Sequence, residues 1–301
     1  MNKTVVQHTL QSKLNTKLLI GEPMHKHTSW RIGGEAEYFV EPTDLTELQK
    51  CIVLANELQI PLTVIGNGTN LLVLDSGIQG LVVKIGRGLD HIKIDKTTIT
   101  AGAGALLPVL ARRAMEKGLA GFAWSAGIPG SIGGAVIMNA GAYGASISDV
   151  IQAALVLDQD GQLRRLNKEQ MGFGYRTSAL QNGPWVVVEA VFNCLPGDKE
   201  AIKAQMDENN AKRKAVQPQG YPNAGSVFKN PPGDSAGRLI ELAGCKGLKV
   251  GNAQVSTHHA NWIVNLGGAT ARDVLSLIDI IKGRVKEKFD VALQLEVRVL
   301  G

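Results

Sequence analysis

The chain has 301 residues, 44% of them hydrophobic and 20% charged, and a net charge of +5. This length allows two or three subdomains and a large core, and no apolar run approaches the roughly 20 residues of a membrane span. The N-terminal 17 residues lack the apolar core of a signal peptide, so we expect a soluble cytoplasmic protein. Basic and acidic residues are interspersed and only 5% of residues are aromatic, which disfavours nucleic-acid binding.

The first predicted element is a helix over 43–58. Asp44 and Glu47 have capping-box spacing, an apolar stripe follows, and Pro61 marks the end. Short strands are expected next, over 62–65, 71–74 and 80–85. A strand, a helix and a strand in quick succession predict an α/β unit.

The middle of the chain has a mixed pattern. A helix is predicted over 105–117, and strand-like runs occur at 97–101, 151–157, 162–166 and 185–193. A mostly polar helical run over 198–215 is typical of a connector between domains.

The last third predicts an α+β arrangement. Its strongest helix covers 271–289, with Thr270 and Asp273 as a capping pair. Residues 293–299 alternate between apolar and polar side chains, which predicts a half-buried strand.

A first glycine-rich segment, GNGTN at 66–70, directly follows the strand predicted over 62–65. A strand that runs into such a turn can aim successive backbone N–H groups at a phosphate. The segment lacks the GxGxxG pattern of a Rossmann fold. A plain hairpin turn is the alternative interpretation.

A second and more specific segment is GIPGSIGGAVIMNAGAYG at 127–144, which contains six glycines. So many glycines cost conformational entropy unless the backbone must approach something closely. We expect a loop wrapped over a flat, pyrophosphate-linked cofactor, with Ser131 and Asn139 as side-chain hydrogen-bonding groups. The alternative is a tightly packed turn in the core.

Three further residues carry a strong functional group and lie on a predicted loop or strand. Arg176 lies in Tyr175–Ser178, Ser226 lies with Lys229 in the segment 223–232, and Glu296 lies on the last predicted strand. On chemistry alone these side chains would be solvated surface groups.

Several catalytic classes are disfavoured. The adjacent pair His258–His259 would point to opposite faces of a strand, and no third ligand stands at metal spacing, so we expect no metal. Neither a GxSxG elbow nor a Walker A motif occurs. Three widely spaced cysteines without a CxxC pair indicate free thiols.

Seven collinear segments together resemble the UDP-N-acetylenolpyruvoylglucosamine reductase family of peptidoglycan synthesis. They cover nearly the whole chain after its first twenty or so residues. The segments are HTSWRIGG (27–34), GNGTNLLV (66–73), AGIPGSIGGAVIMNAGAYG (126–144), GYRTSAL (174–180), PNAGSVFKNP (222–231), AGRLIELAGCKGLKVGNAQVSTHHANWIVN (236–265) and LQLEVRVLG (293–301).

The resemblance implies a vanillyl-alcohol-oxidase-type (PCMH-type) FAD-binding fold with an α+β substrate domain. It implies FAD-binding subdomains over 1–88 and 89–197 and a substrate-binding domain over 198–301. The residues it assigns to FAD are Gly66, Asn67, Gly68, Thr69, Asn70, Leu71, Gly127, Ile128, Gly130, Ser131, Ile132, Gly133, Gly134, Asn139, Gly141 and Ala142.

The same resemblance implies two half-reactions. NADPH reduces the bound FAD and leaves, and the enolpyruvyl UDP-sugar then takes a hydride at its terminal methylene, giving UDP-N-acetylmuramate. Arg176 would stabilise the resulting enolate-like charge, Ser226 would donate the proton, and Glu296 would orient the substrate or donate a hydrogen bond.

Further matching places Tyr175, Lys229, Asn230, Lys246 and His259 at the substrate. Some relatives carry glutamine in place of His259. Only 50 residues (226 minus 176) separate Arg176 from Ser226, so the chain resembles the short form of the family, which lacks an inserted tyrosine loop.

Two other functions are weighed against this one. The first is an FAD oxidase of the same fold, although 127–144 holds no His or Cys to tether a flavin. The second is a non-enzymatic nucleotide-binding module, which leaves Arg176, Ser226 and Glu296 unexplained. The expected partners are therefore small molecules, with neither nucleic acid nor membrane, and a monomer is the expected state.

Overall fold

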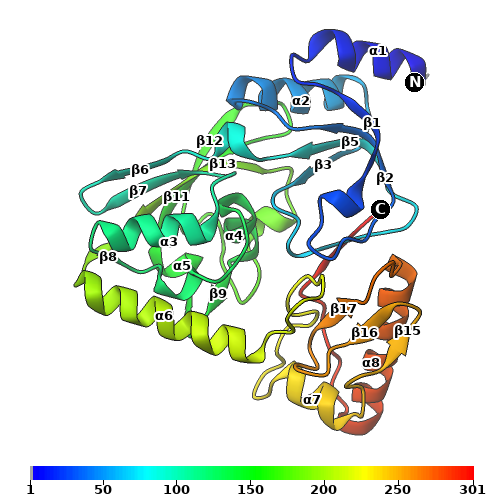
Figure 1. Cartoon of the computed structure of the whole chain (residues 1–301). Coiled ribbons are helices and arrows are strands. Elements are labelled where there is room, and N and C mark those ends of the chain that lie inside the picture. Colours follow the sequence, from blue (N-terminus) through cyan, green and yellow to red (C-terminus); the bar gives the residue numbers. More distant parts are fainter. Residues whose placement is uncertain (1–2) are drawn as a thin grey trace. The chain divides into compact units, whose positions relative to one another are not determined.

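The computed structural model describes residues 3–301, which form two compact units (Figure 1). The first unit contains the chain up to Ile20 together with Tyr38–Asn67 and Gly80–Arg213. The second unit contains Gly21–Glu37, Gly68–Gln79 and Lys214–Gly301. The division into three subdomains stays a prediction. No helix within residues 3–301 is long and apolar enough to cross a membrane.

A four-stranded sheet has the order β1-β2-β5-β3, with β3 and β5 parallel. Its strands are β1 (Leu19–Pro23), β2 (Glu35–Val40), β3 (Leu62–Ile65) and β5 (Ile78–Lys84). The predicted helix is α2 (Leu45–Glu57), and it begins where expected because the Asp44 carboxylate accepts a 2.8 Å hydrogen bond from the Glu47 backbone N–H. The apolar stripe of α2 and the N-terminal helix α1 (Lys3–Lys13) share one core with β5.

A five-stranded antiparallel sheet forms the rest of the first unit's framework. Its order is β12-β11-β13-β7-β6. The strands are β6 (Ile92–Asp95), β7 (Thr98–Gly102), β11 (Ile151–Leu157), β12 (Leu163–Asn167) and β13 (Val186–Asn193). Helices α3 (Leu107–Glu116) and α6 (Lys199–Val216) lie where the sequence predicts helices.

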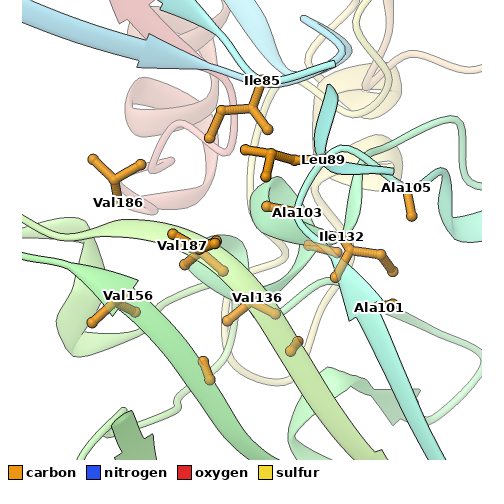
Figure 2. Close-up of a cluster of buried hydrophobic side chains, with 14 of the residues drawn as sticks. Ile85, Leu89, Ala101, Ala103, Ala105, Ile132, Val136, Val156, Val186 and Val187 are labelled. Atoms are coloured by element: carbon orange, nitrogen blue, oxygen red, sulfur yellow. The ribbon is translucent and has the colours of Figure 1, made fainter. Parts of the chain in front are cut away.

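The glycine-rich stretch 127–144 differs from the loop that we expected, because its centre is helix α4 (Ile132–Met138). Ile132 and Val136 of α4 lie beside Ala103 and Val187 in the core (Figure 2). The apolar residues of the stretch therefore pack inward and fix its position. The stretch also contains β9 (Gly141–Ala142), which pairs with β10 (Ala145–Ser146). Further short elements of the first unit are β8 (Leu119–Ala120), α5 (Ile147–Val150) and β14 (Leu195–Pro196).

The second unit has its own core, formed mainly by α8 (Ala271–Phe289), α7 (Ala236–Leu242) and a small sheet. The sheet has the order β15-β16-β17 (Lys249–Val250, Ala253–Val255 and Ile263–Asn265). Helix α8 has the predicted bounds, and Thr270 and Asp273 form the predicted capping box. The Asp75 carboxylate also accepts hydrogen bonds from the Ala271 and Arg272 backbone N–H groups, at 2.8 and 3.0 Å.

The strand predicted over 293–299 is wrong in extent. Only β18 (Arg298–Leu300) is a strand, and it pairs in parallel with β4 (Leu71–Val73). Leu293 and Val297 are buried as the alternation predicts, but Leu295 makes only an isolated bridge with Phe228. The partner of this part of the chain is a loop, so no continuous ladder forms.

Candidate active site

A pocket of about 450 Å³ lies within the first unit, and two of the predicted cofactor residues, Asn67 and Ser131, line it. The Asn67 side-chain amide donates a 2.8 Å hydrogen bond to the Pro129 carbonyl. Gly66 lies directly against Ser131, because a Cβ at Gly66 would overlap the Ser131 hydroxyl. The fold thus brings the first part of the GNGTN segment to the start of helix α4.

Other parts of the same pocket were not predicted. Two glycines also line it. A Cβ at Gly104 would overlap the Gly86 carbonyl, which is backbone, whereas a Cβ at Gly86 would meet only the Glu41 carboxylate, which can move. The charged residues of the lining are three cations, Lys84, Arg87 and Arg113, and two carboxylates, Glu41 and Asp90. Glycine backbone suits close approach of a flat group, and cations suit phosphates, so the pocket fits a pyrophosphate-linked cofactor.

Ser131 and Asn139 define the two ends of helix α4. The Ser131 hydroxyl caps the helix by accepting from the Gly134 N–H at 3.4 Å. Asn139 ends it in a left-handed conformation (φ 43°), and its side chain is only 6% exposed. The Asn139 amide donates to the Gly174 carbonyl (2.9 Å) and its side-chain oxygen accepts from the Ser148 N–H (3.0 Å). Its contact with a cofactor stays a prediction.

Arg176 stands in a tight turn of the first unit. Gly174 and Thr177 exchange two backbone hydrogen bonds across this turn, at 3.0 and 3.2 Å. Arg176 itself is left-handed (φ 55°), which is uncommon for a residue other than glycine. Its guanidinium carbon lies 5.3 Å from the ring centroid of Tyr175, a predicted substrate residue that is 54% exposed.

Another cation lies near the glycine-rich stretch. A Cβ at Gly127 would come within 2.9 Å of the Arg213 side chain, so helix α6 passes close to this glycine. Burial lowers the pKa of the Arg213 guanidinium. The sequence shows the basic run that contains Arg213, but it does not show that Gly127 lies next to Arg213.

Ser226 and Glu296 lie on adjacent backbone segments of the second unit. The Glu296 N–H donates to the Val227 carbonyl at 2.8 Å, and the Lys229 N–H donates to the Gln294 carbonyl at 2.9 Å. Both Ser226 and Glu296 are half-buried. The structure thus places Ser226 and Glu296, both predicted to be catalytic, on neighbouring segments that are joined by backbone hydrogen bonds.

Four of the predicted cofactor residues, Gly68 to Leu71, belong to the second unit. The Gly68 carbonyl accepts from the Ser29 N–H at 3.1 Å, and its positive φ of 65° favours glycine. The Asn70 side-chain amide donates a 3.0 Å hydrogen bond to the Glu296 carbonyl. Asn70 is therefore tied to the segment that carries the predicted catalytic carboxylate.

Three predicted substrate residues have partners within the protein. The Asn230 side-chain oxygen accepts from the Ala236 N–H at 3.0 Å, and Lys246 forms a 2.9 Å ion pair with Glu241. His259 Nδ1 accepts from the Asn261 N–H at 3.2 Å, and burial lowers the pKa of His259. Lys229 is half-buried. Substrate contact by these four residues stays a prediction.

All three cysteines are buried free thiols. Burial raises the pKa of Cys51 to about 12 and that of Cys194 to about 11. Both therefore stay protonated near neutral pH and are poor nucleophiles.

Two family models match the chain. The model described as the C-terminal domain of UDP-N-acetylenolpyruvoylglucosamine reductase matches residues 217–300. The model described as an FAD binding domain matches residues 36–167, which include the whole pocket lining.

Curated relatives match over almost their whole length. A UDP-N-acetylenolpyruvoylglucosamine reductase from Desulforamulus reducens is 55% identical, over 97% of this chain and 96% of the relative. A protein of the same name from Bacillus velezensis is 46% identical, over 95% of this chain and 94% of the relative.

Solved structures confirm the expected fold class, an FAD-binding fold of the vanillyl-alcohol-oxidase type with an α+β C-terminal domain. The UDP-N-acetylenolpyruvylglucosamine reductase from Thermus caldophilus has a TM-score of 0.82 and 37% identity, covering 96% of this chain and all of that one. A berberine bridge enzyme variant has a TM-score of 0.50 at 14% identity, covering 64% of this chain and 44% of that one, which shows likeness of fold alone.

Proposed function

This chain belongs to the UDP-N-acetylenolpyruvoylglucosamine reductase family, and on that premise we propose that it reduces UDP-N-acetyl-enolpyruvylglucosamine to UDP-N-acetylmuramate with NADPH. The product would serve peptidoglycan precursor synthesis. FAD, when bound, would accept the hydride from NADPH and pass it to the second substrate. We infer a cytoplasmic setting because the free thiols suit a reducing compartment.

The pocket of the first unit supports the cofactor assignment. Lys84, Arg87 and Arg113 would hold the pyrophosphate through charge-assisted hydrogen bonds. The side-chain-free lining at Gly86 and Gly104 would admit a flat ring. Asn67 and Ser131 would supply neutral hydrogen-bonding groups.

Arg176 is assigned to the developing negative charge. Addition of a hydride to the terminal methylene of the enolpyruvyl group leaves an electron pair on the neighbouring carbon and its carboxylate. A guanidinium can bind that carboxylate with two parallel hydrogen bonds, and it stabilises the charge most at the point where the charge develops. Arg176 fits this role because its left-handed turn holds it in a defined place.

Ser226 is assigned as the donor of the proton that completes the reduction. A serine hydroxyl is a weak acid, but the carbon that receives the proton is strongly basic, and Lys229 can stabilise the alkoxide. Glu296 would orient the substrate or, when protonated, donate a hydrogen bond to it. The observation that carries the proposal is the backbone pairing that places Glu296 beside the Ser226 segment.

An anaerobic visible spectrum of the purified protein tests this function. We expect flavin bands that bleach with NADPH and return only when the enolpyruvyl UDP-sugar is added. A return that requires oxygen would indicate an oxidase. A colourless protein that cannot be reconstituted with FAD would contradict a flavoenzyme and leave the nucleotide-binding module.

A further inference from the structure

We propose that Gln181 is a positioning residue for the reaction, because it holds Arg176 in the conformation from which the guanidinium acts. Ser178 and Asn139 assist it, and we call these three side chains the Arg176 clamp. The inference rests on the proposed function, since it presumes that Arg176 stabilises the enolate charge.

The Gln181 side-chain amide joins two segments of the first unit. Its Nε2 donates to the Arg176 carbonyl at 3.2 Å and to the Ile137 carbonyl at 3.0 Å. A primary amide carries two protons, so one group can serve both carbonyls. Gln181 therefore links the Arg176 turn directly to the last turn of helix α4, which belongs to the cofactor-binding stretch.

Ser178 and Asn139 link the same two segments on either side of Gln181. The Ser178 hydroxyl donates to the Ile137 carbonyl at 2.7 Å, and Ser178 is only 2% exposed. The Asn139 amide donates to the Gly174 carbonyl at 2.9 Å from a site that is also buried. Because water is largely excluded here, loss of either hydrogen bond would leave a buried polar group without a partner, which costs free energy.

The backbone of Arg176 needs this support. A non-glycine residue in the left-handed region is strained, and such a conformation persists only where the surroundings impose it. The bond from Gln181 is made to the carbonyl of the strained residue itself. Without that bond the turn can relax and carry the guanidinium away, and a displacement of about 1 Å can slow a reaction about a hundredfold.

Replacement of Gln181 by Met tests the proposal, since methionine has a similar length but donates no hydrogen bond. The matched control is Gln49→Met. Gln49 is half-buried in the same unit, and its amide donates to the Gly161 carbonyl at 3.0 Å, outside the pocket lining and the clamp. Stopped-flow absorbance under anaerobic conditions measures flavin reduction by NADPH and flavin reoxidation by the enolpyruvyl UDP-sugar as separate steps.

For Gln181→Met we expect reoxidation to slow about tenfold to a hundredfold, with reduction by NADPH within about twofold of the wild type. The Gln49→Met control should keep both rates. Reoxidation by Gln181→Met at the wild-type rate would overturn the proposal. If Gln181→Met does not fold, Ser178→Ala gives the second test, and we expect about threefold slower reoxidation from the loss of one clamp bond; an unchanged rate would count against the clamp.

A double-mutant cycle separates a positioning role from an independent one. In an Arg176→Ala background, Gln181→Met should slow reoxidation no further, because the side chain that it positions is gone. A full additional loss would show that Gln181 acts without Arg176 and would refute the proposal. A wild-type protein that the UDP-sugar fails to reoxidise would instead refute the proposed function, and normal reoxidation by Arg176→Ala would refute the role of Arg176.

Discussion

Arg176 and the Ser226–Glu296 pair are held in place by different means. The Arg176 turn is fastened by the side chains of Asn139, Ser178 and Gln181. The Ser226 and Glu296 segments are joined mainly by backbone N–H and carbonyl groups. Backbone hydrogen bonds form with almost any side chain, whereas a side-chain clamp weakens when one of its residues changes. The position of the cation should therefore be more sensitive to substitution of its neighbours than that of the proton donor.

Among the residues of the Arg176 turn, the largest effect should come from Arg176→Lys. Lysine keeps the charge but loses the planar fork that binds a carboxylate with two hydrogen bonds. We expect reoxidation of the flavin by the enolpyruvyl UDP-sugar to slow about a hundredfold to a thousandfold, with reduction by NADPH nearly unchanged. Stopped-flow absorbance measures both steps. Equal slowing of the two would place Arg176 in cofactor binding instead.

Gly104→Ala should weaken the cofactor pocket. The new methyl group would overlap the Gly86 carbonyl, which is backbone and cannot rotate away. We expect at least about tenfold weaker FAD binding, because the lining must shift to admit the methyl group. Titration of the apoprotein with FAD, followed by flavin fluorescence, measures the affinity.

The matched control is Gly283→Ala in helix α8, where an added Cβ meets nothing within 4 Å. This variant should bind FAD normally and gain about 0.5–1 kcal/mol in free energy of unfolding. Normal FAD binding by Gly104→Ala would show that the cofactor does not depend on this lining.

Elements with a clear local signal were predicted well. Helix α8 has its predicted bounds because its capping pair and apolar stripe agree, and β11 (151–157) likewise matches its apolar run. Helix α4 was not predicted because it contains the glycines at 133 and 134, which disfavour a helix, although Ser131 is a common N-cap residue. The strand predicted over 293–299 was wrong because alternating apolar and polar residues indicate which side chains are buried but not what the segment pairs with. The segment lies beside a loop, so no continuous strand pairing forms.

Some candidate site residues were likewise found from the sequence, and others were missed. Arg176, Ser226 and Glu296 were reached through motifs that stand in the sequence, and their roles stay predictions. Lys84, Arg87 and Arg113 were missed because only the fold gathers them around one pocket. Gln181 was missed for another reason: its role depends on two carbonyl groups, and backbone groups leave no trace in a sequence.

Asn70→Asp tests the comparison between the Arg176 turn and the Ser226 and Glu296 segments. Asn70 contributes a side-chain hydrogen bond to those segments, which are otherwise joined mainly by backbone groups. Aspartate at this position cannot donate to the Glu296 carbonyl as the amide does. The net loss of one hydrogen bond, about 0.5–1.5 kcal/mol, corresponds to a reoxidation rate about twofold to tenfold lower. Stopped-flow measurement of flavin reoxidation checks this value. A larger effect than that of Gln181→Met would contradict the contrast between the two regions.

The smallest effect concerns the pH dependence of stability. Burial holds the pKa of His259 below its ordinary value of 6.5 in the folded chain. The unfolded chain therefore binds a proton more readily, and the contribution of neutral His259 to stability is lost as pH falls below 6.5. His259→Gln cannot titrate, so its free energy of unfolding should fall less between pH 7.5 and pH 5. Urea unfolding at both pH values measures this, and an equal fall would exclude His259 as a cause.

The proposed reaction is tested most directly by the rate at which the UDP-sugar reoxidises the flavin in the Ser226→Ala variant. In anaerobic stopped flow with NADPH and then the enolpyruvyl UDP-sugar, we expect the flavin to bleach at the wild-type rate. Its colour should then return about a hundredfold to ten-thousandfold more slowly, because the donor of the final proton is missing. Return of the flavin colour at the wild-type rate would contradict the assignment of Ser226 and, with it, the proposed use of the Ser226–Glu296 pair.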